Sequence, residues 1–208
     1  MLEETQLAYR CVPIDIMVGA QFEPNFVAIS PNGRIPALVD HDGPGGSISI
    51  FESGAILVYL AEKTGRFEGR NSAERSAVLQ WLFWQVGGLG PMAGQLSHFI
   101  NYAPERNAYA IDRYRNEYER LVEVMDRRLE GRDWLAGEYS IADMASFPWL
   151  LPYRKFGIQL DRFGNVRRWY DRIKQRPPVR AAVELGSEWK SGADGMNEHA
   201  RRILFNQR

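Results

Sequence analysis

The stretch Asn-Gly-Arg-Ile-Pro-Ala-Leu-Val-Asp at residues 32–40 runs from a polar turn, through a proline, into an apolar segment typical of a strand. Pro36 has no N–H and pushes Ile35 toward an extended conformation, in which the backbone of Ile35 can pair with an extended ligand. The Ile35–Pro36 bond can be trans, or it can be a cis bond that the fold holds in place. This stretch therefore predicts a strand edge that is open to a peptide-like ligand.

A second stretch, Phe-Glu-Ser-Gly-Ala-Ile-Leu at residues 51–57, predicts the end of a strand and the start of an amphipathic helix. Ser53 stands at this start, where free N–H groups and the positive end of the helix dipole attract a carboxylate. A serine here can also be an N-cap alone, worth about 1 kcal/mol. For a lone serine the N-cap is the favoured interpretation, but a strand edge and a helix start side by side would make a site for a small peptide with a carboxylate.

The residues around both stretches indicate a small α/β unit over residues 1–67. Three strands are predicted, at residues 9–16, 37–40 and 47–51. Residues 42–46 have the glycine and proline content of a turn, so the last two strands form a hairpin. A helix is predicted from Ser53 to Glu62, because Gly65 then stops the pattern.

Residues 71–185 carry a helical pattern throughout and are predicted to form a second, all-helical domain. Capping residues and three- and four-residue spacing predict helices at residues 71–84, 107–129, 140–152, 166–175 and a short one from residue 177. Gly87–Pro91 should interrupt the first of these, with helical pattern resuming toward His98. Residues 186–208 are predicted to be a C-terminal tail, with room for a short helix at residues 198–204.

The composition excludes several classes of protein. The chain has 208 residues with 26 basic and 26 acidic side chains, so no net field attracts nucleic acid or an anionic membrane. No apolar run approaches the roughly 20 residues of a spanning helix, and the first residues lack the pattern of a signal peptide. The single cysteine fits a reducing compartment. We therefore expect a cytoplasmic protein with no nucleic-acid or membrane partner.

The pairing of Ile35–Pro36 with Glu52–Ser53 resembles the glutathione site of the glutathione transferase superfamily. Longer resemblance to the bacterial nu-class enzymes, also described as disulfide-bond oxidoreductases and related to the fungal nitrogen-regulator branch, runs through residues 51–65, 80–92 and 139–143. The resemblance implies a thioredoxin-like α/β domain, shortened at its N-terminus, followed by an all-helical domain of the glutathione-transferase type. It also implies that Ile35, before a cis Pro36, pairs with the cysteinyl backbone of glutathione. Glu52 and Ser53 would hold the γ-glutamyl end.

Three further residues gain a role from the resemblance alone. Gln21, otherwise an exposed polar residue in a loop, would contact glutathione, and Arg34 would meet the glycyl carboxylate. Arg113, otherwise a solvated basic residue on the long helix, would approach the ligand from the helical domain and serve a second glutathione-sized half. A guanidinium suits this role because it binds a carboxylate in bidentate fashion.

Other conspicuous residues are predicted to be structural. Asp143 completes a capping box with Ser140 and so is expected to be a folding element. Cys11 is expected to be a small packed residue, and no second cysteine makes a redox pair with it. The histidines lack metal-ligand spacing, so no metal is expected; they are His41, His98 and His199. Three aromatic residues are expected in the core, although some could wall a pocket or a dimer contact: Trp81, Phe83 and Trp84.

The family plan begins with a strand and a helix for which this sequence has no full counterpart, since Leu2–Glu4 matches only the end of that helix. The loop between them carries, in nu-class enzymes, a Thr/Asn pair that donates a hydrogen bond to the glutathione sulfur. No residue here can be assigned that catalytic role. Three explanations stay open: a start upstream of Met1, a shortened and inactive relative, or a donor from a partner subunit or the tail. Exposed backbone on an inner strand favours the first.

The expected function is therefore a glutathione-dependent disulfide-bond reductase with weak transferase activity, in which the reacting sulfur belongs to bound glutathione or glutathione disulfide. The alternative is a non-catalytic glutathione-binding or regulatory module. A pure scaffold is disfavoured because Pro36, Glu52 and Ser53 are all present. The resemblance also implies a homodimer. The identity of the disulfide or electrophile cannot be deduced from these residues.

Overall fold

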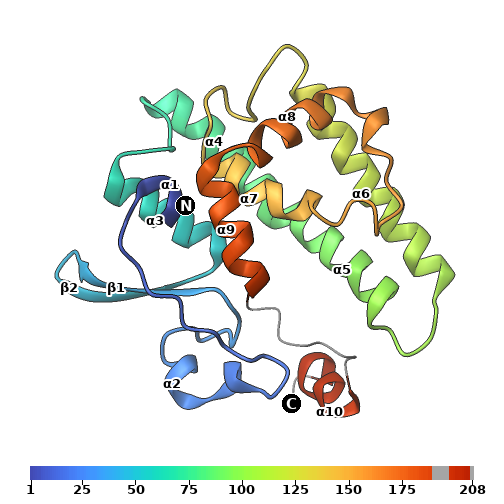
Figure 1. Cartoon of the computed structure of the whole chain (residues 1–208), viewed down its shortest axis with the longest axis horizontal. Coiled ribbons are helices and arrows are strands. Elements are labelled where there is room, and N and C mark those ends of the chain that lie inside the picture. The colour runs from blue at the N-terminus through green and yellow to red at the C-terminus, as the bar shows by residue number, and fades with distance from the viewer. Residues whose placement is uncertain (189–196, 207–208) are drawn as a thin grey trace.

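The computed structural model of the chain describes residues 1–188 and 197–206. A small α/β part packs beside a larger helical part (Figure 1). The small part contains, in chain order, α1 (Leu2–Thr5), a 3₁₀ turn at Ala20–Phe22, α2 (Pro24–Val27), β1 (Ala37–Gly43), β2 (Gly46–Phe51) and α3 (Ser53–Thr64). The predicted hairpin and the helix that follows it are confirmed.

The β1–β2 hairpin is antiparallel, with Ala37 opposite Phe51 at its open end. Asp40 ties it to α3, because its carboxylate accepts hydrogen bonds from Tyr59 Oη at 2.6 Å and from the ammonium of Lys63. The hydrogen bond from Lys63, together with that from Tyr59, lowers the pKa of Asp40 to about 2. The hairpin and α3 are thus fixed to each other immediately beside the two stretches that were predicted to bind a ligand.

The strand predicted at residues 9–16 is wrong, because these residues form no strand and the sheet of the described residues has two strands. The alternation there is weak and Pro13 has no N–H to give to a ladder. A strand also needs a neighbour, and none pairs with this segment. Cys11 is consequently exposed, so the prediction that it is a packed residue is wrong as well.

The helical part contains α4 (Ser72–Trp84), α5 (Gly90–Asn101), α6 (Ala108–Arg128), α7 (Ile141–Leu150), α8 (Gly164–Lys174), α9 (Pro177–Glu188) and α10 (Glu198–Arg201). A π-helical turn at Gln85–Leu89 joins α4 to α5, which confirms the predicted interruption. α9 is longer than expected and runs through Gly186, which costs a helix only about 1 kcal/mol. The tail residues after α10 form a second π-helical turn, Arg202–Asn206.

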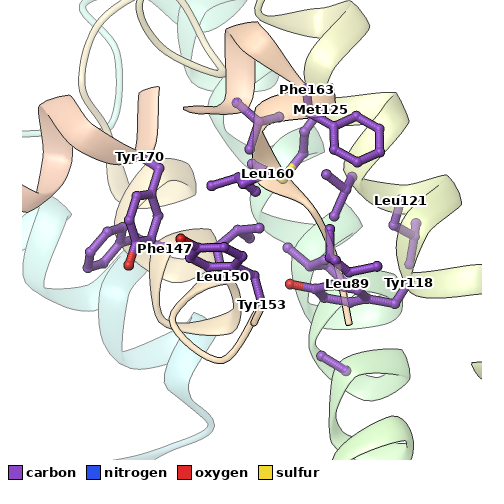
Figure 2. Close-up of a cluster of buried hydrophobic side chains, with 14 of the residues drawn as sticks. Leu89, Tyr118, Leu121, Met125, Phe147, Leu150, Tyr153, Leu160, Phe163 and Tyr170 are labelled. Carbon is purple, nitrogen blue, oxygen red and sulfur yellow. The ribbon is translucent and has the colours of Figure 1, made fainter. Parts of the chain in front are cut away.

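The main core lies between α5, α6, α7 and α8, where Figure 2 shows Leu89, Tyr118, Met125 and Leu150 pointing toward one another. The predicted capping box is present: Asp143 is fully buried and accepts hydrogen bonds from backbone and side-chain donors of residues 135, 140 and 169. Burial, opposed by these donors, raises its pKa to about 6. Its neighbours are structural, which fits the prediction of a folding role.

A second cluster joins the two parts of the molecule. Ala61 of α3 packs with Val78, Leu82 and Ile141 of the helical part. At the same junction Arg176 donates two hydrogen bonds to the buried carboxylate of Glu4, at 2.7 and 2.8 Å. Trp81 and Trp84 pack against the helical core as predicted, whereas Phe83 is 67% exposed and does not. The small part is therefore anchored to the helical part by both apolar and ionic contacts.

Candidate functional site

A cavity of about 150 Å³ lies between the turn that precedes β1 and the start of α3. It brings together the two stretches that were predicted to bind a ligand. Its lining residues are Ser30, Asn32, Arg34, Ile35, Pro36, Phe51, Glu52 and Ser53. The hairpin explains this proximity, because β1 leads away from the turn and β2 returns to α3.

The Ile35–Pro36 peptide bond is cis, which decides between the two geometries that the sequence left open. Ile35 is 51% exposed. Neither its N–H nor its C=O makes a hydrogen bond to any residue that the structure describes. The backbone of Ile35 is therefore available to pair with an extended ligand, as predicted for this edge.

The turn before Ile35 is held by Ser30, which the sequence analysis missed. Ser30 is fully buried, and its hydroxyl donates to the carbonyl oxygen of Arg34 at 2.7 Å and accepts from the Arg34 N–H at 3.4 Å. Gly33 has a φ of 59°, and a Cβ there would lie 3.2 Å from the ring of Phe22. The Ser-Pro-Asn-Gly sequence marks a turn, but nothing in it shows that the serine points inward.

The start of α3 leaves backbone donors facing the cavity. Glu52 is the N-cap and Ser53 the first helical residue, so Ser53 is not the N-cap that the structural interpretation supposed. Glu52 makes no side-chain cap hydrogen bond among the described residues and has a φ of 70°. The first N–H groups of a helix lack intrahelical partners. This end of α3 therefore offers free donors and the positive end of the dipole.

Two residues that were predicted to bind glutathione do not line this cavity. Gln21 was expected to be exposed, but it is buried, at 4% exposure, and its side chain donates to the carbonyl oxygen of Ile16 at 3.2 Å. Arg113 lies on α6 with its side chain 57% exposed and 3.8 Å from the carboxylate of Glu117. The binding roles of Gln21 and Arg113 stay predictions.

A larger cavity, of about 520 Å³, lies between α7, α8 and α9 and shares no residue with the first. Its walls are mainly apolar, among them Phe147, Leu151, Val179 and Val183. It does not combine a free strand edge with a helix start. The smaller cavity has the more specific chemistry, because it places a cation, an anion and unpaired backbone donors around one space.

The chemistry of the smaller cavity suits a short zwitterionic peptide. Arg34 can bind one carboxylate and the start of α3 another, while Glu52 can bind an ammonium group. The lining residues include no thiol and no imidazole. Reactive sulfur at this site would therefore come from the ligand.

Within residues 1–188 and 197–206, no helix is both long and apolar enough to cross a bilayer. The same residues contain no group of three His, Cys, Asp or Glu side chains that could hold a metal ion.

Comparison with known proteins identifies both parts of the chain. The profile of the glutathione S-transferase N-terminal domain matches residues 1–62, and that of the C-terminal domain matches residues 89–177. The chain is 51% identical over 193 residues to the disulfide-bond oxidoreductase YfcG of Escherichia coli (strain K12), covering 90% of each chain. It is 40% identical over 194 residues to the disulfide-bond oxidoreductase YghU of the same organism, covering 86% of this chain and 67% of YghU.

Solved structures agree with these matches. A glutathione transferase from Pseudomonas putida, crystallised with one glutathione disulfide bound per subunit, superposes with a TM-score of 0.84 at 41% identity. The match covers 88% of this chain and 84% of that one. The predicted resemblance and the predicted fold class, a thioredoxin-like domain followed by a helical domain, are both confirmed.

Proposed function

The chain belongs to the glutathione S-transferase family, and from that premise we propose that it binds glutathione in the cavity beside α3 and reduces disulfide bonds with it. The observation that carries the proposal is the free backbone of Ile35, before a cis proline, facing the uncapped start of α3. The names of its two relatives from Escherichia coli support disulfide reduction as the reaction.

Glutathione has two carboxylates and one ammonium group, and the lining residues offer a partner for each. Ile35 pairs with the cysteinyl backbone, as one strand pairs with the next. Ser53 and the free N–H groups of α3 bind the γ-glutamyl carboxylate, and Glu52 binds the γ-glutamyl ammonium. Arg34, the residue before Ile35, lines the same cavity and binds the glycyl carboxylate.

The cavity volume of about 150 Å³ fits one end of the tripeptide rather than all of it. Sites that enclose a whole small ligand measure about 300–1,000 Å³. We therefore place the γ-glutamyl end in the cavity, with the cysteinyl thiol outside it and open to a second substrate. Arg113 is proposed to hold the second half of a glutathione disulfide. Its exposed side chain has one weak ion pair to give up, worth about 0.3–0.5 kcal/mol.

The proposed reaction is thiol–disulfide exchange. The thiolate of bound glutathione attacks the glutathione sulfur of a mixed disulfide, a new S–S bond forms, and the other thiolate leaves and takes up a proton. The products are glutathione disulfide and a free thiol. The chain has one cysteine, Cys11, so it has no internal cysteine pair that could do this work itself.

Two properties beyond the site are part of the proposal. A cytoplasmic location is supported by the exposed thiol of Cys11, which a reducing compartment keeps free. A homodimer is supported by exposed aromatic side chains, since Phe51 is 38% exposed and Phe83 is 67% exposed. Light scattering measures the molar mass of the wild type and of Phe83→Glu and so tests the dimer. A monomer mass for both proteins would reject it.

Calorimetric titration with reduced glutathione tests the site. Replacing both Glu52 and Ser53 with alanine should weaken binding at least tenfold, because it removes a charged partner from a bound ligand. Ser49→Ala is the matched control, since Ser49 is an exposed serine on β2 that does not line the cavity. Unchanged binding in the double variant would reject the site.

The reaction is tested with the mixed disulfide of cysteine and glutathione as substrate. Its turnover is measured as the release of glutathione disulfide. Glutathione-dependent turnover supports the reductase. Tight binding without turnover would instead support the alternative function, a glutathione-binding or regulatory module. No binding at all would reject both.

A further inference from the structure

Asn32 reaches across the cavity to Glu52. The two residues line the same space from opposite sides, and the Asn32 Nδ2 donates a hydrogen bond to the Glu52 Oε1 at 3.3 Å. No role has been assigned to Asn32 beyond its place in a turn. Its contact therefore needs its own explanation.

The turn that carries Asn32 is rigid on both sides. Ser30, before it, is fully buried and bonded to the backbone of Arg34, after it. Gly33 adopts a left-handed conformation, and Phe22 packs within 3.3 Å of the position that a Cβ there would occupy. Ser30 and Gly33 therefore fix the backbone on which Asn32 stands, and this position lets its carboxamide reach Glu52.

Glu52, by contrast, is exposed. Among the described residues, its carboxylate accepts its hydrogen bond from Asn32. A free glutamate side chain samples several rotamers and loses conformational entropy when one of them is fixed. Asn32 occupies Oε1 and leaves Oε2 for a cation. The donor is neutral, so it orients the carboxylate without cancelling its charge.

We propose that Asn32 is a positioning residue, which orients the Glu52 carboxylate toward the α-ammonium group of a γ-glutamyl ligand. The proposal deepens the proposed function and rests on it. It makes Asn32 a determinant of specificity, because its effect is limited to ligands that carry the ammonium. A lysine or arginine in its place would neutralise Glu52, and an aspartate would repel it.

The test compares two ligands that differ by one group: reduced glutathione, and glutaryl-cysteinyl-glycine, which lacks only the amino group. Calorimetry gives the dissociation constant Kd of each, and the ratio of the two measures the recognition of the ammonium. Asn32→Ala should lower the preference for glutathione about fivefold, the effect of one modest hydrogen bond. The Kd of the glutaryl peptide should not change.

Two variants complete the double-mutant cycle, and a third serves as a control. Glu52→Gln should abolish the preference, and adding Asn32→Ala to it should change nothing further. Asn25→Ala, an exposed asparagine on α2 outside the cavity, should leave both constants unchanged.

Two results would overturn the proposal while leaving glutathione binding intact. An unchanged ratio in Asn32→Ala would show that Asn32 does not act on the ammonium. An equal loss for both ligands would show that Asn32 only supports the turn. If wild-type protein bound no glutathione, the proposed function would fail and this inference with it.

Discussion

Glu52 combines a strained backbone with a proposed role in binding, so replacing it with glycine should separate stability from function. Its φ of 70° lies in the region that favours glycine, and within the described residues its side chain gives α3 no capping hydrogen bond that a glycine would remove. Backbone strain of this kind costs about 1–3 kcal/mol. Two effects of the glycine oppose this gain. Its greater freedom in the unfolded chain costs about 0.5–1 kcal/mol of stability, and the exposed hydrogen bond to Asn32 is lost.

The balance predicts that Glu52→Gly stabilises the fold by about 1 kcal/mol, or about 2–4 °C in the unfolding midpoint for a chain of this size. Urea unfolding at neutral pH measures the change. Glutathione binding should weaken at least tenfold in the same variant, because the ammonium partner is gone. Stability and binding should therefore move in opposite directions.

Glu23→Gly is the matched control, because Glu23 is also an exposed glutamate at the N-cap position of a helix but has a φ of −65°. Without strain to relieve, glycine there should destabilise the fold by about 0.5–1 kcal/mol. If Glu52→Gly destabilised the protein as much as Glu23→Gly does, the assignment of strain would be refuted. If it bound glutathione as tightly as the wild type, the assignment of Glu52 to the site would be refuted.

Two further predictions concern the packing that supports the site. Arg176→Met should cost about 2–4 kcal/mol in urea unfolding, because it leaves the buried carboxylate of Glu4 without its partner. Burial alone would raise the pKa of Glu4, but the hydrogen bonds and charge of Arg176 outweigh burial and lower it. The ionised Glu4 therefore stabilises the fold above pH 4.5, and this stabilisation is lost as the pH falls below that value. In Arg176→Met the stabilisation should be missing at every pH. Gly90→Ala should cost about 1–3 kcal/mol, since its Cβ would lie 2.6 Å from the buried Gln85. Gly94→Ala, which meets nothing within 4 Å on the same helix, should stabilise by about 0.5–1 kcal/mol, and equal effects at both glycines would refute the packing argument.

The parts of the fold that could be predicted are those whose cause is local. Asn71, Asn107 and Ser140 each cap a helix with their own side chain, and the sequence contains those caps. The hairpin follows from its turn residues. Both halves of the site were found for the same reason, since a proline and a helix start have signatures in the residues beside them.

The parts that could not be predicted depend on distant neighbours. Residues 9–16 look like a strand in isolation, but a strand forms only if another strand pairs with it. Gln21 and Ser30 are polar residues in turns, and their burial is decided by what the fold places over them. Cys11 is exposed because its predicted strand is absent. Patterns of polarity along a chain carry no information about such partners.

α3 can offer an uncapped start to a ligand because the rest of the helix is fixed by other contacts. Ala61 is fully buried against the helical part, Lys63 is bound to Asp40 of the hairpin, and Gly65 ends the helix in a left-handed conformation. A helix of twelve residues would be marginal alone, so these contacts, and not the missing cap, hold it together. The free N–H groups are therefore in place before a ligand arrives, and binding does not have to order them. The same reasoning explains why a strained residue persists at Glu52: the packing of α3 outweighs the strain, and a ligand meets a carboxylate and a helix start that are already aligned.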